Sequence, residues 1–244
     1  MATNERGPKW RVIAGIALPL MGLISSIRVR GEENVPAEGP FIVAPCHFSA
    51  IDPVVMGVGV WKAGRVPRFM AKSSLFTIPV LGQILRSLGQ IPVEREGTQR
   101  ALGPMKAART LAKEGHGVII YPEGTLTRDP ELWPMRGKTG AVRMALESNI
   151  PLIPAAHWGT ADLMPRYSGK IRLFPRSPIQ VLIGKPLDMS RFEGKVRDQK
   201  LLAEATDYLM QAIADLQSQL RGIPAPEKRW NPAEHGQSET GAFR

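Results

Sequence analysis

Short apolar runs alternate along the chain with stretches whose apolar residues recur every three or four positions. The apolar runs predict strands at 41–44, 66–71, 90–93, 117–121, 150–156, 171–174 and 179–183. The stretches with helical periodicity predict helices at 54–60, 72–88, 104–113, 138–147 and 201–220. Strands that alternate with helices predict an α/β fold, here a single domain with a largely parallel central sheet flanked by helices.

The C-terminal end differs in composition from this domain, which we place at residues 29–222. The last predicted helix ends before Gly222, and the sequence that follows is rich in proline and polar residues. Such a composition buries too little apolar surface to pack, so residues 223–244 are predicted to be a disordered tail.

The N-terminal segment, residues 1–28, contains an apolar stretch from Val12 to Ile27 that is interrupted by Pro19 and flanked by basic residues and Trp10. It is shorter than the about 20 apolar residues that a membrane span needs. It lacks a small-residue cleavage site, which argues against a removed signal peptide. Two interpretations remain, a helix in the membrane interface and a helix packed on the protein's own core. The basic and aromatic flanks favour the interfacial helix.

Charge narrows the choice of partners. The chain has 244 residues with 32 basic and 22 acidic side chains, a formal net charge of +10, which indicates an anionic partner. The basic residues are dispersed and no Cys/His finger accompanies them, so we expect no nucleic-acid partner. Cys46 is the single cysteine, which excludes an intrachain disulfide. Its place beside a histidine favours inert packing over a nucleophile, because neighbours in a strand point to opposite faces.

A histidine and an aspartate lie at the junction of the strand 41–44 and the helix 54–60. His47 follows the strand, and Asp52 precedes Pro53 at the start of the helix. A loop of this length can fold the carboxylate onto the imidazole, which fixes the ring tautomer and leaves the other nitrogen as a base. The attacking hydroxyl would then belong to the substrate. The alternative is a buried histidine bound to a backbone carbonyl beside an ordinary helix cap.

Polar side chains follow other predicted strands as well. Arg95 comes just after the strand 90–93, and Glu123 comes just after the strand 117–121. Ligands of α/β sheets gather at the carboxyl ends of strands. We therefore expect His47, Arg95 and Glu123 to meet in one cleft.

Four blocks in this order resemble the glycerophospholipid acyltransferase family, whose best-known bacterial members are 1-acylglycerol-3-phosphate acyltransferases. The blocks are His-x-x-x-x-Asp at 47–52, Gly-Gln-Ile-Pro-Val-Glu-Arg at 89–95, Tyr-Pro-Glu-Gly-Thr at 121–125 and Ile-Pro-Leu-Ile-Pro at 150–154. The resemblance covers roughly residues 29–186. The first and third blocks together are fairly specific, whereas either alone would not be.

The resemblance implies transfer of an acyl chain from acyl-CoA or acyl carrier protein to the hydroxyl of 1-acylglycerol 3-phosphate, giving phosphatidate. Glycerol 3-phosphate or a glycolipid is the alternative acceptor. By this likeness His47 is the general base and Asp52 its orienting partner. Arg95, Glu123, Gly124 and Thr125 match the positions that hold the acceptor. No metal or cofactor is implied beyond the acyl donor. The implied location is the cytoplasmic face of the cell membrane, as a peripheral or monotopic protein, and the oligomeric state is left open.

The residue types suit this chemistry. A positioned base contributes about 10²–10⁴-fold in rate. Arg95 can bind a phosphate bidentately, which a lysine cannot do. Lys72 and Arg128 are candidate helpers or plain surface charges. Glu123 can bond an acceptor hydroxyl or lock its loop.

The third block departs from the family pattern. Gly124 allows a ligand to approach the backbone closely, or serves the turn, and Thr125 matches the family. Many relatives carry an arginine next, where this chain has Leu126. The missing arginine removes one possible ligand of the acceptor's phosphate, for which Arg128, or Arg136 and Lys138, are the candidates to compensate. The departure therefore bears on which acceptor is used more than on the type of reaction.

Two other classes of function compete with the acyltransferase. A hydrolase would use His47 to activate water, but the sequence lacks a Gly-x-Ser-x-Gly elbow and a metal-ligand spacing among its four histidines. A non-catalytic lipid-surface binding protein would need only the basic surface and the N-terminal helix. Replacement of His47 separates these classes.

Overall fold

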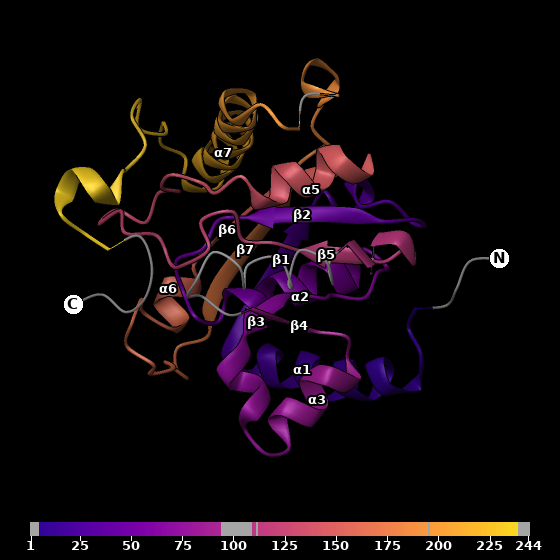
Figure 1. The fold of residues 1–244 in the computed structure, drawn as a ribbon. Coiled ribbons are helices and arrows are strands. Elements are labelled where there is room, and N and C mark those ends of the chain that lie inside the picture. Colours follow the sequence, from indigo (N-terminus) through magenta and orange to yellow (C-terminus); the bar gives the residue numbers. More distant parts are fainter. Residues whose placement is uncertain (1–4, 94–108, 111, 195, 239–244) are drawn as a thin grey trace.

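The computed structural model describes residues 5–93, 109–110, 112–194 and 196–238 (Figure 1). Its main sheet has the strand order β1-β7-β6-β2-β5, and all neighbours are parallel except β6 and β7. The strands are β1 (Ser25–Arg30), β2 (Phe41–Pro45), β5 (Gly117–Ile119), β6 (Leu152–Trp158) and β7 (Ser177–Ile183). The largely parallel sheet of an α/β domain is therefore confirmed.

A second sheet extends the first beyond β5. It pairs β3 (Met70–Lys72) with β4 (Ile91–Val93) in parallel. Residues 68 and 69, just before β3, join the two sheets. Ile119 N of β5 donates to Arg68 O over 2.8 Å, and Ile91 N of β4 donates to Phe69 O over 2.9 Å. The predicted strand 66–71 is thus much shorter, since only its last two residues belong to β3.

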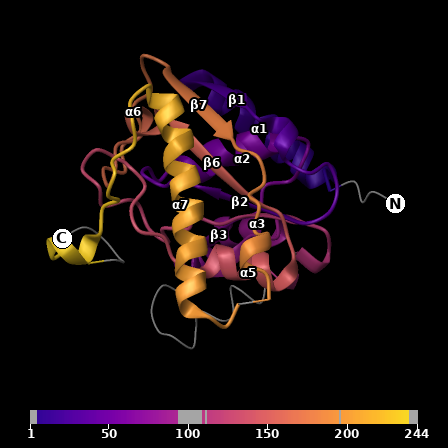
Figure 2. The ribbon, with the colours of Figure 1, turned by 90° about the horizontal axis from the view of Figure 1, so that it is seen from above.

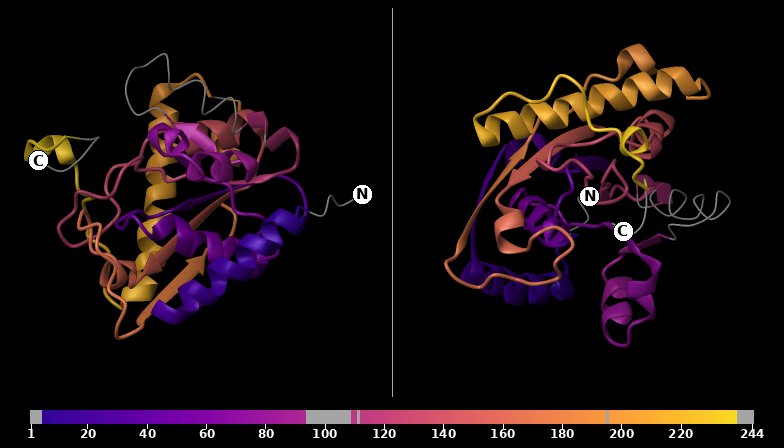
Figure 3. Two further views of the ribbon diagram at one scale, coloured as in Figure 1. Left: turned by 90° about the horizontal axis from the view of Figure 1, so that it is seen from below. Right: turned by 90° about the vertical axis from the view of Figure 1, so that its left-hand side faces the viewer.

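Helices cover both faces of the main sheet (Figures 2 and 3). One face packs against α5 (Gly140–Ser148) and α7 (Gln199–Arg221), and the other against α2 (Asp52–Lys62) and the end of α1 (Pro8–Ile24). Two short helices, α3 (Leu81–Ser87) and α6 (Thr160–Leu163), follow β3 and β6. Short 3₁₀ turns lie at Glu32–Asn34, Ser73–Thr77, Ser190–Phe192 and Pro232–His235.

The longest helix, α7, confirms the prediction for 201–220 and shows why it ends where it does. The Asp198 side chain accepts hydrogen bonds from Lys200 N and Leu201 N, which caps the N-terminus. At the other end Gly222 adopts a left-handed conformation with φ of 69°. Its buried residues pack on one face of the sheet.

The N-terminal apolar stretch divides into two elements, which corrects the prediction of one segment from 12 to 27. Residues 8–24 form α1, and residues 25–30 form β1 on the edge beside β7. In β1 the apolar Ile27 and Val29 pack against the core while Arg28 and Arg30 alternate with them on the exposed side. The predicted domain boundary at residue 29 therefore falls inside a strand.

The predicted strand at 171–174 is wrong. These residues form no strand and are exposed, with Phe174 79% accessible. Arg172 N donates to Leu163 O over 2.8 Å, so this segment bonds to the end of α6 rather than to a strand. The predicted helix at 104–113 lies mainly outside the described residues.

The disorder predicted after Gly222 does not hold for residues 223–238. Arg136 N donates to Trp230 O over 3.1 Å, and Pro232 is buried. The Trp230 ring stacks on His235 with centroids 3.6 Å apart. The hydrogen bond from Arg136 and the buried Pro232 hold to the domain a segment whose polar composition alone predicts disorder.

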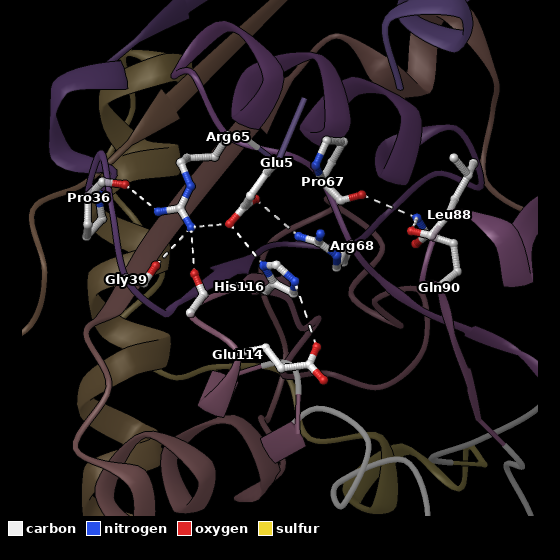
Figure 4. Close-up of polar contacts among 11 residues, drawn as sticks. Glu5, Pro36, Gly39, Arg65, Pro67, Arg68, Leu88, Gln90, Glu114 and His116 are labelled. Carbon is white, nitrogen blue, oxygen red and sulfur yellow. Dashed lines mark hydrogen bonds and ion pairs between the residues drawn. The ribbon is translucent and has the colours of Figure 1, made fainter. Parts of the chain in front are cut away.

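A buried ionic cluster ties the start of the chain to the sheet (Figure 4). The Glu5 carboxylate lies 2.7 Å from Arg65 Nη2, 3.2 Å from Arg68 Nη1 and 3.1 Å from His116 Nδ1. Arg65 also donates to the carbonyl oxygens of Pro36, Gly39 and Gly115. The cluster anchors the segment that leads into α1.

Replacement of Glu5 should therefore destabilise the fold in a pH-dependent way. Burial raises the pKa of Glu5, but Arg65, His116 and Arg68 outweigh it and hold the pKa below its usual value. The group then contributes stability above its unfolded pKa of about 4.3, and that contribution is lost as pH falls through the lower folded pKa. We expect Glu5→Gln to lower the free energy of unfolding by about 1 kcal/mol at pH 7.

Urea unfolding at pH 7 and pH 3 measures this effect. The difference between wild type and Glu5→Gln should shrink at pH 3. Glu114→Gln is the control, because that carboxylate is largely exposed and lies 3.8 Å from His116. An equal loss at both pH values would contradict the ionic origin.

Candidate active site

The histidine and the aspartate of the first block meet directly. His47 follows the end of β2, and Asp52 is the first residue of α2. The loop between them turns back, so that His47 Nδ1 lies 3.0 Å from Asp52 Oδ2. The same oxygen accepts hydrogen bonds of 2.7 Å from Phe48 N and from Ser49 N. The carboxylate is therefore held by its own loop and bonds one nitrogen of the imidazole.

The charge on Asp52 decides the tautomer of His47. Asp52 is buried, which raises its pKa, but His157, His47 and the Ser49 N–H outweigh burial and lower the pKa below its usual value. An ionised carboxylate can only accept, so Nδ1 of neutral His47 carries the proton. Nε2 is then the basic nitrogen, and the His47 side chain is 12% exposed.

An aromatic ring holds the imidazole from another strand. Tyr121 follows β5, and its ring centroid lies 4.0 Å from that of His47 at an interplanar angle of 30°. Burial raises the pKa of Tyr121 well above its usual value, so the phenol stays neutral. The packing restricts rotation of the base without competing for its proton.

Glu123 joins three segments around this pair. Its Oε1 accepts from His47 N over 3.0 Å, and its Oε2 accepts from Met135 N over 3.1 Å. The side chain is buried, and burial raises the pKa of Glu123 to about 8. Glu123 was expected to bond an acceptor hydroxyl or to lock its loop, and the structure shows the contacts that lock the loop.

Glu123 also lines a cavity and is followed by a turn at Gly124. Gly124 has φ of 70°, and a Cβ there would stand 3.2 Å from Lys138 Nζ, so a side chain at this position would be strained. Thr125 is buried. The cavity has a volume of about 250 Å³ and is lined by Glu123, Met135, Arg136, Gly137, Lys138, Thr139 and Pro232.

Arg128 is engaged inside the protein. It is buried and donates to Tyr167 Oη over 2.6 Å and to Ser238 O over 3.2 Å. Arg166 braces the same loop by donating to the carbonyl oxygens of Thr127 and Asp129, each over 2.7 Å. Of the candidate cations after Leu126, Arg136 and Lys138 therefore line the cavity, whereas Arg128 stabilises a loop.

The structure brings Glu123 to His47 and Asp52 from a distant part of the chain. Arg95 lies outside the described residues. Lys72 is the last residue of β3, and the placement of its side chain also lies outside what is described. Across the described ranges, no group of three or more His, Cys, Asp or Glu side chains is arranged to hold a metal ion.

His157 is a buried site residue to which the sequence analysis gives no role. It is the next-to-last residue of β6, and its Nε2 lies 3.5 Å from Asp52 Oδ2. The signal that points to it is positional, because it stands at the carboxyl end of a predicted strand.

An apolar cavity of about 220 Å³ lies among α1, α2 and α3. Val54, two residues after Asp52, lines it together with residues of α1, α2 and α3 that include Trp10, Trp61 and Leu85. The outer side of α1 is apolar too, with Val12, Ile16, Leu20 and Leu23 between 57% and 66% exposed. No helix in the described part of the chain is long and apolar enough to cross a membrane.

Comparison with known proteins agrees with this geometry. Residues 26–158 match the family model described as Acyltransferase. The chain is 33% identical over 203 residues to the 1-acyl-sn-glycerol-3-phosphate acyltransferase of Bacillus subtilis, which covers 82% of this chain and 93% of that protein. It is 30% identical to the enzyme of the same name from Saccharomyces cerevisiae, with 74% and 59% covered.

A chloroplast relative and a solved structure complete the comparison. The Brassica napus 1-acyl-sn-glycerol-3-phosphate acyltransferase BAT2 is 29% identical, and the match spans 44% of its length. The crystal structure of the 1-acyl-sn-glycerophosphate acyltransferase PlsC from Thermotoga maritima superimposes with a TM-score of 0.63 at 23% identity, covering 95% of this chain and 86% of that one. That likeness shows a shared fold. With the family model, the relatives and the paired His47 and Asp52 in agreement, this chain belongs to the acyltransferase family and is an acyltransferase.

Proposed function

We propose that the protein transfers a fatty acyl chain from a thioester to 1-acylglycerol 3-phosphate and so makes phosphatidate. The observation that carries the proposal is the His47–Asp52 pair, with 3.0 Å between Nδ1 and Oδ2. The names of the relatives from Bacillus subtilis and Saccharomyces cerevisiae support this acceptor. The donor is acyl-CoA or acyl carrier protein, either of which is an acidic partner for a chain of net charge +10.

The pair supplies a base for the substrate's own hydroxyl. His47 Nε2 takes the proton as the acceptor oxygen attacks the thioester carbonyl, and Asp52 stabilises the imidazolium that forms. The tetrahedral intermediate collapses by breaking the carbon–sulfur bond. The departing thiolate takes the proton back from Nε2, so the enzyme returns to its starting state.

Cations near the pair would hold the acceptor's phosphate. Arg95 is proposed as the bidentate ligand, with Lys72 as a helper. Arg136 and Lys138 add two positive charges at the cavity beside Glu123, which supports a compensating role for the arginine that Leu126 replaces. Glu123 lines the same cavity and accepts a hydrogen bond from His47 N, which ties the cavity to the pair. Gly124 and Thr125, which follow Glu123, are proposed to contact the acceptor.

The lipid substrate also requires a membrane surface. We propose that α1 lies in the interface at the cytoplasmic face of the cell membrane, as a peripheral or monotopic attachment. Its exposed apolar side chains and its basic flanks support this placement. The apolar cavity that starts at Val54 would receive the apolar part of a lipid.

The test is a transfer assay of the purified protein with a panel of acceptors, read by product mass. We expect acylation of 1-acylglycerol 3-phosphate in preference to glycerol 3-phosphate and to unphosphorylated monoacylglycerol. Release of free fatty acid without an acylated product would indicate a hydrolase. A protein that binds vesicles and yields neither product would be a lipid-surface binding protein.

A substitution at Arg95 tests the phosphate contact. Arg95→Lys keeps the charge but removes the bidentate fork, so we expect the KM for 1-acylglycerol 3-phosphate to rise about tenfold. The KM for the thioester and the KM for monoacylglycerol should stay within a factor of two. Equal increases for donor and acceptor would count against a phosphate role.

A further inference from the structure

A second imidazole stands behind the proposed catalytic pair. β6 runs parallel to β2, with Ala155 opposite Pro45, and Cys46 N donates to Ala155 O over 3.3 Å. His157, two residues further along β6, therefore lies beside the start of the loop that carries His47. Its side chain has no exposed surface.

The partners of His157 define its protonation. Nε2 lies 3.1 Å from Cys46 O and 3.5 Å from Asp52 Oδ2, and both of these atoms only accept. Nδ1 lies 3.3 Å from the Thr160 hydroxyl, which can donate to it. The neutral tautomer with hydrogen on Nε2 donates to Cys46 O, keeps the same N–H near Asp52 Oδ2, and leaves Nδ1 to accept from Thr160. Burial also lowers the pKa of His157 despite the opposing charge of Asp52, which favours the neutral ring.

His157 gives Asp52 a contact from outside its own loop. The other groups at Oδ2 are His47 and the backbone N–H groups of Phe48 and Ser49, all within five residues in sequence. A buried carboxylate needs such partners, and in the described part of the chain Oδ1 has no hydrogen-bond partner. The Phe48 ring packs on His157 with centroids 4.6 Å apart, which adds a second tie between loop and strand.

We propose that His157 is a positioning residue for acyl transfer, whose Nε2–H holds the Cys46 carbonyl and the Asp52 carboxylate in the arrangement by which Asp52 meets His47. The inference rests on the proposed function, because it requires His47 to be the base. His157 does not touch the substrate. It acts through the orientation of Asp52, and a small misplacement of a catalytic group costs up to about 10²-fold in rate.

The experiment compares two replacements of His157. His157→Leu removes both nitrogens, and we expect kcat per folded enzyme to fall about 10- to 100-fold with both KM values within a factor of two. His157→Gln offers an amide N–H toward Cys46 O and an oxygen toward Thr160, so it should recover most of kcat. Wild-type kcat in His157→Leu, or an equal deficit in both variants, would overturn the proposal.

A measurement on the wild-type protein keeps the proposal open to refutation if a variant fails to fold. Histidine ¹⁵N resonances of the wild-type protein should show His157 as the neutral Nε2–H tautomer at pH 7, and a proton on Nδ1 would overturn the assignment. His116→Leu, in the Glu5 cluster, is the control for loss of a partly buried histidine and should lower stability while keeping kcat. Retained transfer in His47→Ala would refute the proposed function itself, which is a result distinct from an active His157→Leu.

Discussion

Replacement of His47 by alanine should abolish acyl transfer and leave the protein folded and able to bind lipid vesicles. The substitution removes the only group at this position that can accept the acceptor's proton, and a positioned base contributes about 10²–10⁴-fold in rate. We therefore expect kcat to fall by about 10³-fold or more. The thioester and the acceptor should bind with unchanged affinity, because the imidazole acts mainly in the transition state.

Steady-state kinetics and vesicle sedimentation measure the two properties separately. His116→Ala is the matched control, since it removes a histidine from the Glu5 cluster rather than from the pair. Substantial transfer by His47→Ala would exclude the base assignment. Loss of vesicle binding together with activity would mean that the substitution disturbs the fold or the lipid surface instead of the chemistry.

Local sequence was enough to predict the pair, because its members lie in one loop. His47 and Asp52 are five residues apart between a strand and a helix, and the first turn of α2 carries the carboxylate back to the ring. The approach of Glu123 to His47 could be predicted from topology, since β2 and β5 are parallel neighbours whose carboxyl ends lie together.

Contacts that depend on how elements pack could not be predicted in this way. His157 stands in a run of buried residues with no polar alternation to mark it, and its role emerges only because β6 lies beside β2. β1 is hard to recognise in the sequence, because only two serines separate its apolar residues from the apolar stretch of α1. In the C-terminal segment, Pro232 is buried against the domain, which composition cannot show.

Asp52→Asn tests how much the negative charge of Asp52 contributes to acyl transfer. The structure predicts how the asparagine amide would be oriented. Oδ2 receives two backbone N–H groups over 2.7 Å besides His47, whereas Oδ1 has no hydrogen-bond partner among the described residues. The amide oxygen of asparagine should therefore take the place of Oδ2, because an NH₂ group there would face two donors. His47 would keep its proton on Nδ1, and only the negative charge would be lost.

The orientation of the asparagine amide determines both the loss of kcat in Asp52→Asn and the tautomer of His47. An asparagine that forced the other tautomer would block the base, whereas loss of charge alone removes the stabilisation of the imidazolium. We expect kcat to fall about 10²–10³-fold with both KM values unchanged, a smaller loss than in His47→Ala. Histidine ¹⁵N spectra of Asp52→Asn should still show His47 with its proton on Nδ1. Asp162→Asn, at an exposed carboxylate of α6, serves as the control. A proton on Nε2 of His47, with a loss as deep as that of His47→Ala, would mean that the backbone donors at 48 and 49 do not decide how residue 52 is oriented.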